Sequence, residues 1–188
     1  MTTKLFETNR LVAYQLNASF ANIVLSYYEN NADHFKKSMP LWSEDFLTFD
    51  YQMKLLMKQG QDINNGTFFK FWLFEKEDAE LTKIVGDVSL GHIIRGSLQS
   101  CFVGYKMDQK FVGIGLMHEA LTAIIKYAFK TLKLHRLEVN IMPSNMDSVS
   151  LAERLLFKKE GFSPNYLKIN GKWENHIRYA MLNEIEEV

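Results

Sequence analysis

The chain has few of the features on which secreted and membrane proteins depend. Its 188 residues include a single cysteine, Cys101, so a disulfide framework within the chain is excluded and the usage fits a reducing compartment. No stretch approaches the roughly 18 consecutive apolar residues of a membrane span. The N-terminus, MTTKLFETNR, lacks the apolar segment of a secretory signal. We therefore expect a cytoplasmic protein that does not cross a membrane.

An excess of charge of either sign is also missing. Lys and Arg total 22, and Asp and Glu total 22. A chain without net charge has no general electrostatic attraction for nucleic acid, so strong nucleic-acid binding is not expected. The chain has no internal repeat, low-complexity tract or linker rich in proline and glycine, and this favours one domain over residues 1–188.

Hydrophobic periodicity and turn residues predict the secondary structure. The first half is predicted to contain a strand at 10–14, a helix at 18–29, a loop with helical turns at 30–48, a helix at 51–59 that ends at Gly60, and strands at 67–74, 84–94 and 98–107. The second half is predicted to contain a helix at 116–132, a strand at 135–142, a helix at 147–157, and a hairpin at 162–182 with its turn at Asn170-Gly171. This order favours an α+β fold, with one central mixed, twisted sheet of about seven strands and helices on both faces.

Gly113 and Gly115 lie between a predicted strand and the clearest predicted helix. Glycine permits positive φ angles and a close approach of the backbone to a ligand, and the first N–H groups of a helix are unpaired and partially positive. Such a turn can bind phosphate groups, although a tight turn that needs glycine only for its own geometry is the simpler alternative. The spacing does not match the three-glycine dinucleotide motif, because His118 stands at the third position, and it lacks the Gly-Lys-Ser/Thr of a P-loop.

A wider set of motifs accompanies the glycine turn. Its members are Ile94-Arg95-Gly96-Ser97, Val103-Gly104-Tyr105, Gly115-Leu116-Met117 with Glu119-Ala120-Leu121, His135-Arg136, Met142-Pro143 with Asn145, Lys159-Glu160-Gly161, and Tyr166-Leu167 with Gly171, Trp173 and His176. With these residues the chain resembles the GCN5-related N-acetyltransferase (GNAT) superfamily. It is most similar to the RimJ type within the RimJ/RimL group, whose members acetylate N-terminal residues of ribosomal proteins. The resemblance extends from Thr8 to Leu182 and implies the GNAT fold.

The resemblance implies acetyl-CoA as the cosubstrate. We expect no metal, because the histidines do not pair at a metal-binding spacing and His118-Glu119 is followed by Thr122 where a zinc motif needs histidine. The diphosphate of acetyl-CoA would contact backbone N–H groups of residues 112–117, the pantetheine arm would lie beside residues 105–107, and Asn145 would hold that arm from the other side. The implied cofactor-binding residues are Tyr105, Met107, Val112, Gly113, Ile114, Gly115, Leu116, Met117 and Asn145. Val112 stands where the superfamily prefers Gln or Arg, so the phosphates would be held mainly by the backbone.

Direct acetyl transfer needs a neutral amine and a group that protonates the leaving thiolate. Glu138 lies in the middle of a predicted strand and shares a face with Arg136 and Asn140, so it is either the general base or an ion-pair partner of Arg136. Ser148 is either the acid that protonates the thiolate or a hydroxyl that satisfies backbone N–H groups at the start of a helix. Glu138 and Ser148 are the candidate catalytic residues, and the oxyanion is expected to meet a backbone N–H near Met107.

Contacts to the acceptor amine are expected from the 30–48 loop, the last hairpin and a neighbouring strand. Aromatic residues and histidines in such segments often bind ligands, although each can also be structural. The candidate substrate-binding residues are Phe35, Trp42, His92, Trp173 and His176.

The resemblance implies an enzyme that acetylates the N-terminal alanine or serine amine of a ribosomal protein, as a monomer or homodimer. An α-amine, with a pKa of about 7.7–8.0, is partly neutral at pH 7, whereas a lysine, with a pKa of about 10.4, needs a stronger base. Because no compelling base is evident, the sequence favours an N-terminal amine. Two alternatives stay open. One is an N-acetyltransferase of a small amine, such as a polyamine, an amino acid or an antibiotic, and the other is a non-catalytic protein that binds CoA or assists ribosome assembly.

Overall fold

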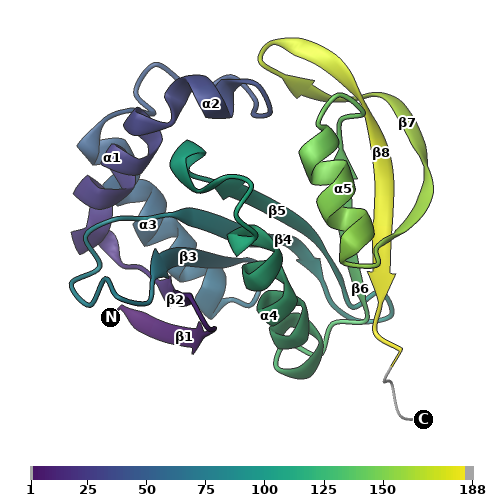
Figure 1. Ribbon diagram of the computed structural model, residues 1–188, viewed down its shortest axis with the longest axis horizontal. Helices are drawn as coiled ribbons and strands as arrows, with labels where there is room; N and C mark the ends of the chain where they lie inside the picture. Colours follow the sequence, from purple (N-terminus) through teal and green to yellow (C-terminus); the bar gives the residue numbers. More distant parts are fainter. Residues whose placement is uncertain (1, 185–188) are drawn as a thin grey trace.

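One eight-stranded sheet runs through the protein in a computed structural model that describes residues 2–184. The strands are β1 (Thr3–Glu7), β2 (Leu11–Gln15), β3 (Phe69–Glu75), β4 (Gly86–Ile94), β5 (Ser100–Met107), β6 (Arg136–Ile141), β7 (Lys158–Ile169) and β8 (Lys172–Leu182). Their order across the sheet is β1-β2-β3-β4-β5-β6-β8-β7, in which β5 and β6 pair in parallel and the other described pairs are antiparallel. The mixed, twisted sheet that the sequence predicts is therefore confirmed (Figure 1).

Helices cover both faces of this sheet. They are α1 (Ala21–Asn30), α2 (Ala32–Lys36), α3 (Phe49–Asn64), α4 (Leu116–Lys130) and α5 (Met146–Arg154), with short 3-10 turns η1 (Ala18–Phe20) and η2 (Gln109–Phe111). Side chains of α1 and α3 form one buried core with the sheet, and those of α4 and α5 form another (Figure 1). Because successive strand residues point to opposite faces, a central strand must be apolar on both sides.

Strand β3 shows this requirement directly. Phe71 and Leu73 enter the core that α4 covers, whereas Trp72 and Phe74 enter the aromatic core that α1 and α3 cover. All four side chains are at most 1% exposed. Burying each large apolar side chain contributes about 1.5–3 kcal/mol, so β3 joins the two cores strongly.

The two parallel strands separate soon after they begin. Backbone pairing joins residues 100–102 of β5 to residues 136–138 of β6. β5 then continues to Met107 along β4, while β6 continues to Ile141 along β8. Beyond residue 102, the edge of β5 that faces β6 has no strand partner among the described residues. This opening positions the site described below.

Elements whose limits depend on distant partners differ from the prediction. The sequence does not predict β1, which forms an edge strand by pairing with β2. The short α2 is one of the helical turns expected within the 30–48 segment. α3 passes through Gly60 and ends at Asn64, because Gly66, with a φ of 69°, closes the helix through its N–H bond to the Ile63 carbonyl oxygen. β7 begins at Lys158, before the predicted hairpin at 162.

Candidate functional site

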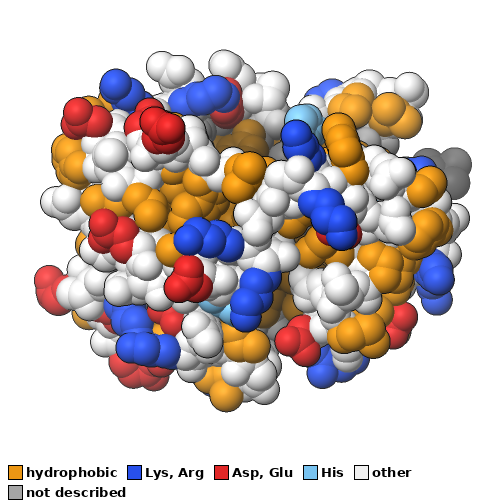
Figure 2. All heavy atoms as spheres, turned by 90° about the horizontal axis from the view of Figure 1, so that it is seen from above, with side chains coloured by type: hydrophobic (Ala, Val, Ile, Leu, Met, Phe, Trp, Pro, Cys, Tyr) orange, Lys and Arg blue, Asp and Glu red, His pale blue; other side chains and the backbone are white. Residues whose placement is uncertain are grey.

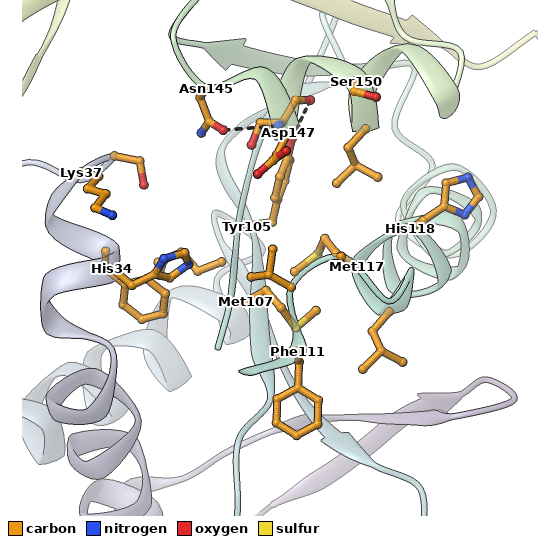
Figure 3. Close-up of a pocket in the computed structure, with 18 of the residues that line it drawn as sticks. His34, Lys37, Tyr105, Met107, Phe111, Met117, His118, Asn145, Asp147 and Ser150 are labelled. Atoms are coloured by element: carbon orange, nitrogen blue, oxygen red, sulfur yellow. Dashed lines mark hydrogen bonds between the residues drawn. The ribbon is translucent and has the colours of Figure 1, made fainter. Parts of the chain in front are cut away.

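A cavity of about 1000 Å³ lies where β5 and β6 separate. Four segments form its walls: α2 with the residues that follow it, the end of β5, the glycine turn with the start of α4, and the inner face of α5 (Figure 3). A space of this size can hold a ligand as large as a nucleotide cofactor.

The cavity brings together most of the residues predicted to bind a cofactor. Its lining includes Tyr105, Met107, Val112, Gly113, Gly115, Leu116, Met117 and Asn145. Ile114 lies apart from them, because its side chain is 55% exposed and its carbonyl oxygen accepts a hydrogen bond from Arg10 Nη1 at 3.0 Å. Residues from three segments of the chain thus meet around one space.

The glycine turn has the backbone geometry of an anion site. Gly113 and Gly115 have φ angles of 84° and 82°, and Gly115 caps α4 in the left-handed region. A Cβ at Gly113 would meet no atom within 4 Å, so conformation rather than space requires glycine there. The first N–H groups of a helix have no partner inside it, and residues 115–118 all line the cavity. Together with the helix dipole, these N–H groups suit phosphate.

Asn145 organises the wall opposite β5. Its Oδ1 caps α5 by accepting a hydrogen bond from Ser148 N at 3.3 Å, which leaves the Nδ2 amide as a donor for other groups (Figure 3). Tyr105 Oη on β5 donates to the Ser148 carbonyl oxygen at 3.4 Å and so bridges the two walls. Burial raises the pKa of Tyr105, so this hydroxyl stays protonated at neutral pH. The cap belongs to Asn145, and the Ser148 residue itself lines the cavity.

Basic side chains outnumber acidic ones around the cavity. Among the described residues, the basic ones are His34, Lys37, Lys106, His118 and Arg154, and the one carboxylate in the lining is Asp147. Figure 2 views the molecule from above and shows Lys and Arg side chains spread over that face among exposed hydrophobic side chains and those of Asp and Glu. Lys37, Lys106 and Arg154 alone outnumber Asp147, and this excess of cationic side chains complements a ligand that carries several phosphates.

Of the predicted acceptor-binding residues, the loop contributes one to the cavity. Phe35 lines the wall but is only 2% exposed, because its ring packs against Tyr27 and Tyr28. Trp42 stacks on Phe46 at a centroid distance of 4.4 Å and packs against the aromatic core instead. Of these two side chains, Phe35 therefore lies in the cavity wall and Trp42 lies in the aromatic core.

The other three predicted acceptor contacts lie on strands outside the cavity lining. His92 is exposed on β4, where pairing with β5 is irregular, and its ring meets that of Phe102. His176 is 3% exposed, and its Nδ1 lies 3.0 Å from the Glu174 carbonyl oxygen. Trp173 is 57% exposed near the start of β8. The structure does not bring these three side chains to the cavity.

Glu138 is held in an ion-pair cluster outside the cavity lining. Its carboxylate lies 2.9 Å from Arg136 Nε and 3.7 Å from Arg178 Nη2, and Arg136 also pairs with Glu160. Hydrogen bonding to Glu160 and Glu138 raises the pKa of Arg136 even above its usual high value. Of the two roles that the sequence allows, the structure shows the ion pair, and it does not test the general-base role.

Part of α5 was missed by reasoning from sequence. Asp147, Ser150, Leu151 and Arg154 line the cavity from one face of this helix. Their spacing of three and four residues is the pattern of a single helix face, so the signal was present once Asn145 and Ser148 were placed in the site. Arg10, which touches the glycine turn from outside, carries no local signal of that contact.

Neither a metal cluster nor a spanning helix is seen in residues 2–184. No group of three or more His, Cys, Asp or Glu side chains there could hold a metal ion. No helix in the same range is long and apolar enough to cross a membrane.

Comparisons with known proteins agree with this geometry. The family model described as "Acetyltransferase (GNAT) domain" matches residues 28–158. The chain is 36% identical over 163 residues to "Probable N-acetyltransferase YjcK" of Bacillus subtilis, with 87% of this chain and 88% of that protein covered. It is 35% identical over 174 residues to the [ribosomal protein uS5]-alanine N-acetyltransferase of Escherichia coli, with coverage of 93% and 88%. The crystal structure of ribosomal-protein-S5-alanine acetyltransferase from Vibrio fischeri superposes with a TM-score of 0.90 at 30% identity, covering 97% of this chain and 98% of that one.

Proposed function

The chain belongs to the GNAT acetyltransferase family and is an acetyl-CoA-dependent N-acetyltransferase, and we propose that its acceptor is the α-amine of a ribosomal protein that begins with alanine or serine. The observation that carries this proposal is the 35% identity, over 93% of the chain, to an enzyme named for ribosomal protein uS5 alanine. Such an acceptor would place the enzyme in the cytoplasm.

The donor site follows from the cavity. The N–H groups at the start of α4 would hold the diphosphate of acetyl-CoA, and the basic side chains around the cavity would balance its charge. The unpaired edge of β5 beyond residue 102 would pair with the amides of the pantetheine arm, as an added strand would. The Asn145 Nδ2 group would hold the same arm from α5.

When bound, acetyl-CoA supplies an activated thioester, and the protein must orient it and manage two protons. A backbone N–H near Met107 would stabilise the oxyanion that forms on the acetyl carbonyl. The Ser148 hydroxyl would donate a proton to the departing sulfur. Tyr105, bonded to the Ser148 carbonyl oxygen, would keep that turn of α5 in place against β5.

The supply of general bases favours an α-amine over a lysine. Asp147 is the one carboxylate in the described cavity lining, and Glu138 is engaged by two arginines outside it. An α-amine with a pKa of about 7.7–8.0 has a useful neutral fraction at pH 7, whereas deprotonating a lysine there costs about 3.5 kcal/mol more. An α-ammonium group would therefore need only a weak base or a water relay to lose its proton.

Thiol release from acetyl-CoA with a panel of acceptors tests the proposal. The panel holds peptides that begin with alanine or serine, the same peptides with a blocked N-terminus, and spermidine. We expect turnover with the free peptides and none with the blocked ones. Turnover with spermidine alone would move the protein to the class of small-amine acetyltransferases, and CoA binding without turnover on any acceptor would support a binding protein.

A further inference from the structure

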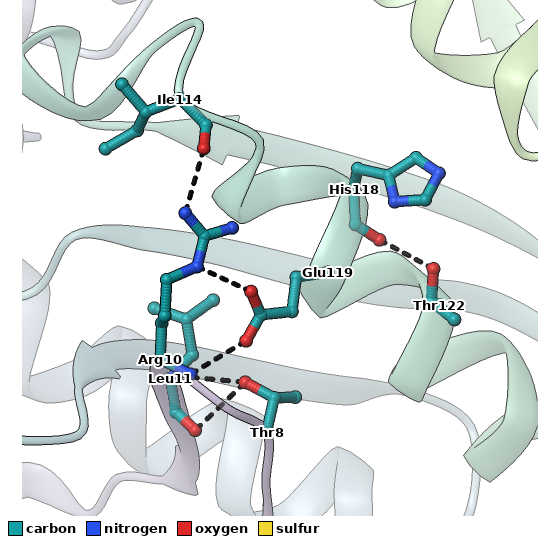
Figure 4. Close-up of polar contacts among 7 residues, drawn as sticks. All are labelled: Thr8, Arg10, Leu11, Ile114, His118, Glu119 and Thr122. Atoms are coloured by element: carbon teal, nitrogen blue, oxygen red, sulfur yellow. Dashed lines mark hydrogen bonds and ion pairs between the residues drawn. The ribbon is translucent and has the colours of Figure 1, made fainter.

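Arg10 lies outside the cavity and holds the glycine turn from behind (Figure 4). It stands in the turn between β1 and β2, 109 residues before Glu119 of α4. Its Nη1 donates to the Ile114 carbonyl oxygen at 3.0 Å, and its Nε donates to Glu119 Oε2 at 2.8 Å. Its backbone N–H donates to Glu119 Oε1, also at 2.8 Å. One residue thus engages both oxygens of a carboxylate and the middle carbonyl of the turn.

Arg10 is itself fixed by the sheet. Its carbonyl oxygen accepts a hydrogen bond from Lys76 N at 2.9 Å, and Thr8 closes the β1–β2 turn through bonds to both backbone groups of Leu11. Burial alone would raise the pKa of Glu119, but hydrogen bonds from Thr8 and Arg10 lower it, so the carboxylate stays ionised. The contact therefore joins a rigid strand turn to the first turn of a helix.

The bond to Ile114 fixes the direction of the next N–H. In a trans peptide unit the C=O and the following N–H point in opposite directions, and no cis peptide occurs among the described residues. The Ile114 carbonyl points to Arg10, so the Gly115 N–H points away from Arg10. Gly115 lines the cavity, whereas neither Ile114 nor Arg10 does. The N–H that Arg10 orients therefore lies on the cavity side of the turn.

This peptide unit needs such a restraint. Gly113 and Gly115, at φ of 84° and 82°, flank Ile114, and glycine occupies positive and negative φ about equally well. The 114–115 peptide can therefore turn over with little steric resistance. Val112 and Ile114 are both apolar and more than 40% exposed, so their side chains add no polar restraint of their own. The hydrogen bond from Arg10 supplies the restraint that local sequence lacks.

We propose that Arg10 is a positioning residue for the donor site, which fixes the 114–115 peptide and the first turn of α4 in the orientation that receives the diphosphate of acetyl-CoA. Arg10 acts through the backbone and does not itself touch the ligand. Its loss should weaken every ligand that carries the diphosphate and spare a donor that lacks it.

Binding and turnover with and without the diphosphate test this role. Arg10→Gln and Arg10→Lys are compared with Arg95→Gln, a control that removes another arginine-to-carbonyl bond, from Arg95 Nη1 to the Leu132 oxygen at 2.6 Å beyond the far end of α4. Calorimetry gives the Kd of CoA and of dephospho-CoA, which keeps the diphosphate. Steady-state rates are measured with acetyl-CoA and with S-acetylpantetheine, which has no diphosphate.

We expect Arg10→Gln to raise the Kd of CoA and dephospho-CoA about tenfold and to raise the KM of acetyl-CoA with kcat nearly unchanged. Its kcat/KM for S-acetylpantetheine should match that of the natural chain. Arg10→Lys, which can reach one of the two partners, should lie between, and Arg95→Gln should bind CoA normally.

Unchanged CoA affinity in Arg10→Gln would overturn the proposal, and so would an equal loss of activity with S-acetylpantetheine, which indicates general damage. If Arg10→Gln does not fold, Glu119→Gln can replace it, because it removes the ionic part of the contact. Glu119→Gln should raise the Kd of CoA and the KM of acetyl-CoA by a smaller factor and leave the kinetics with S-acetylpantetheine unchanged. Because calorimetry needs no acceptor, this result is independent of the proposed ribosomal substrate.

Discussion

Lys106 in the cavity wall lies 3.2 Å from the carboxylate of Asp87, which is fully buried in the sheet. Asp87 also pairs with buried Lys70 and accepts a hydrogen bond from Tyr27 Oη at 3.1 Å. Burial alone would raise the pKa of Asp87, but Lys106 and Lys70 outweigh it and lower the pKa. One carboxylate thus holds two ammonium groups and joins the cavity wall to β3, β4 and α1.

This cluster predicts a dependence of stability on pH. Burial lowers the pKa of Lys70 to about 8, even though Asp87 opposes the shift, whereas the unfolded side chain titrates near 10.4. Between these values the unfolded chain binds more protons than the folded one, so the free energy of unfolding should rise with pH. Urea unfolding from pH 8 to 9.5 should show this rise in the natural chain and a flatter profile in Lys70→Met. Equal slopes in the two proteins would contradict the assignment.

Alanine substitutions at Gly115, in the glycine turn, and at Gly60, within α3, should have opposite effects on stability. Gly115→Ala forces an alanine to a φ of 82°, at a cost of about 1–2 kcal/mol. Because the turn should move to relieve this strain, the KM of acetyl-CoA should rise about tenfold. Gly60→Ala is the matched control, because Gly60 lies within α3 and a Cβ there would meet no atom within 4 Å. It should stabilise the protein by about 0.5–1 kcal/mol and leave the KM unchanged. A normal KM in Gly115→Ala would show that the turn does not grip the donor.

Substitution of Ser148 should lower kcat rather than the affinity for CoA. Removing a proton donor to the leaving sulfur should lower kcat roughly 100-fold, whereas the α5 cap, made by Asn145, remains. Ser148→Ala should therefore retain its affinity for CoA and its melting temperature. Steady-state kinetics against acetyl-CoA, with Ser163→Ala on β7 as a control, separate the two parameters. An unchanged kcat would leave Ser148 with a structural role alone.

Substitution of Glu138 should have the reverse effect, a loss of stability with little change in kcat. Glu138→Gln weakens the pairs with Arg136 and Arg178 and should lower the melting temperature, while kcat stays within about threefold because the side chain lies outside the cavity lining. Thermal melting and kcat measured on the same preparation distinguish a structural ion pair from a general base. A hundredfold fall in kcat at unchanged stability would identify Glu138 as the general base after all.

Sequence reasoning succeeded where the signal is local. The apolar spacing of α4 and the turn at Asn170-Gly171, where φ is 44° and 82°, follow from neighbouring residues, and both are found in the structure. Gly113 and Gly115 likewise signal the turn without help from the rest of the chain. The resemblance then predicted a set of cofactor residues, all of which line the cavity except Ile114.

The remaining features depend on contacts between distant segments. Glu138 meets Arg178 because β6 pairs with β8, and no periodicity within β6 contains that information. Trp42 packs on Phe46 and Tyr28 in the aromatic core, a choice that the loop composition leaves open. Arg10 reaches Ile114 across 104 residues, so its role becomes visible only in three dimensions.

The position of the transferred acetyl group distinguishes an α-amine acceptor from a lysine or a small amine. A peptide that begins with a free alanine and carries an internal lysine is incubated with the enzyme and acetyl-CoA, and fragment masses locate the product. We expect one acetyl group, on the α-amine of the alanine. Acetylation of the lysine, or of neither amine while spermidine is acetylated, would contradict this expectation.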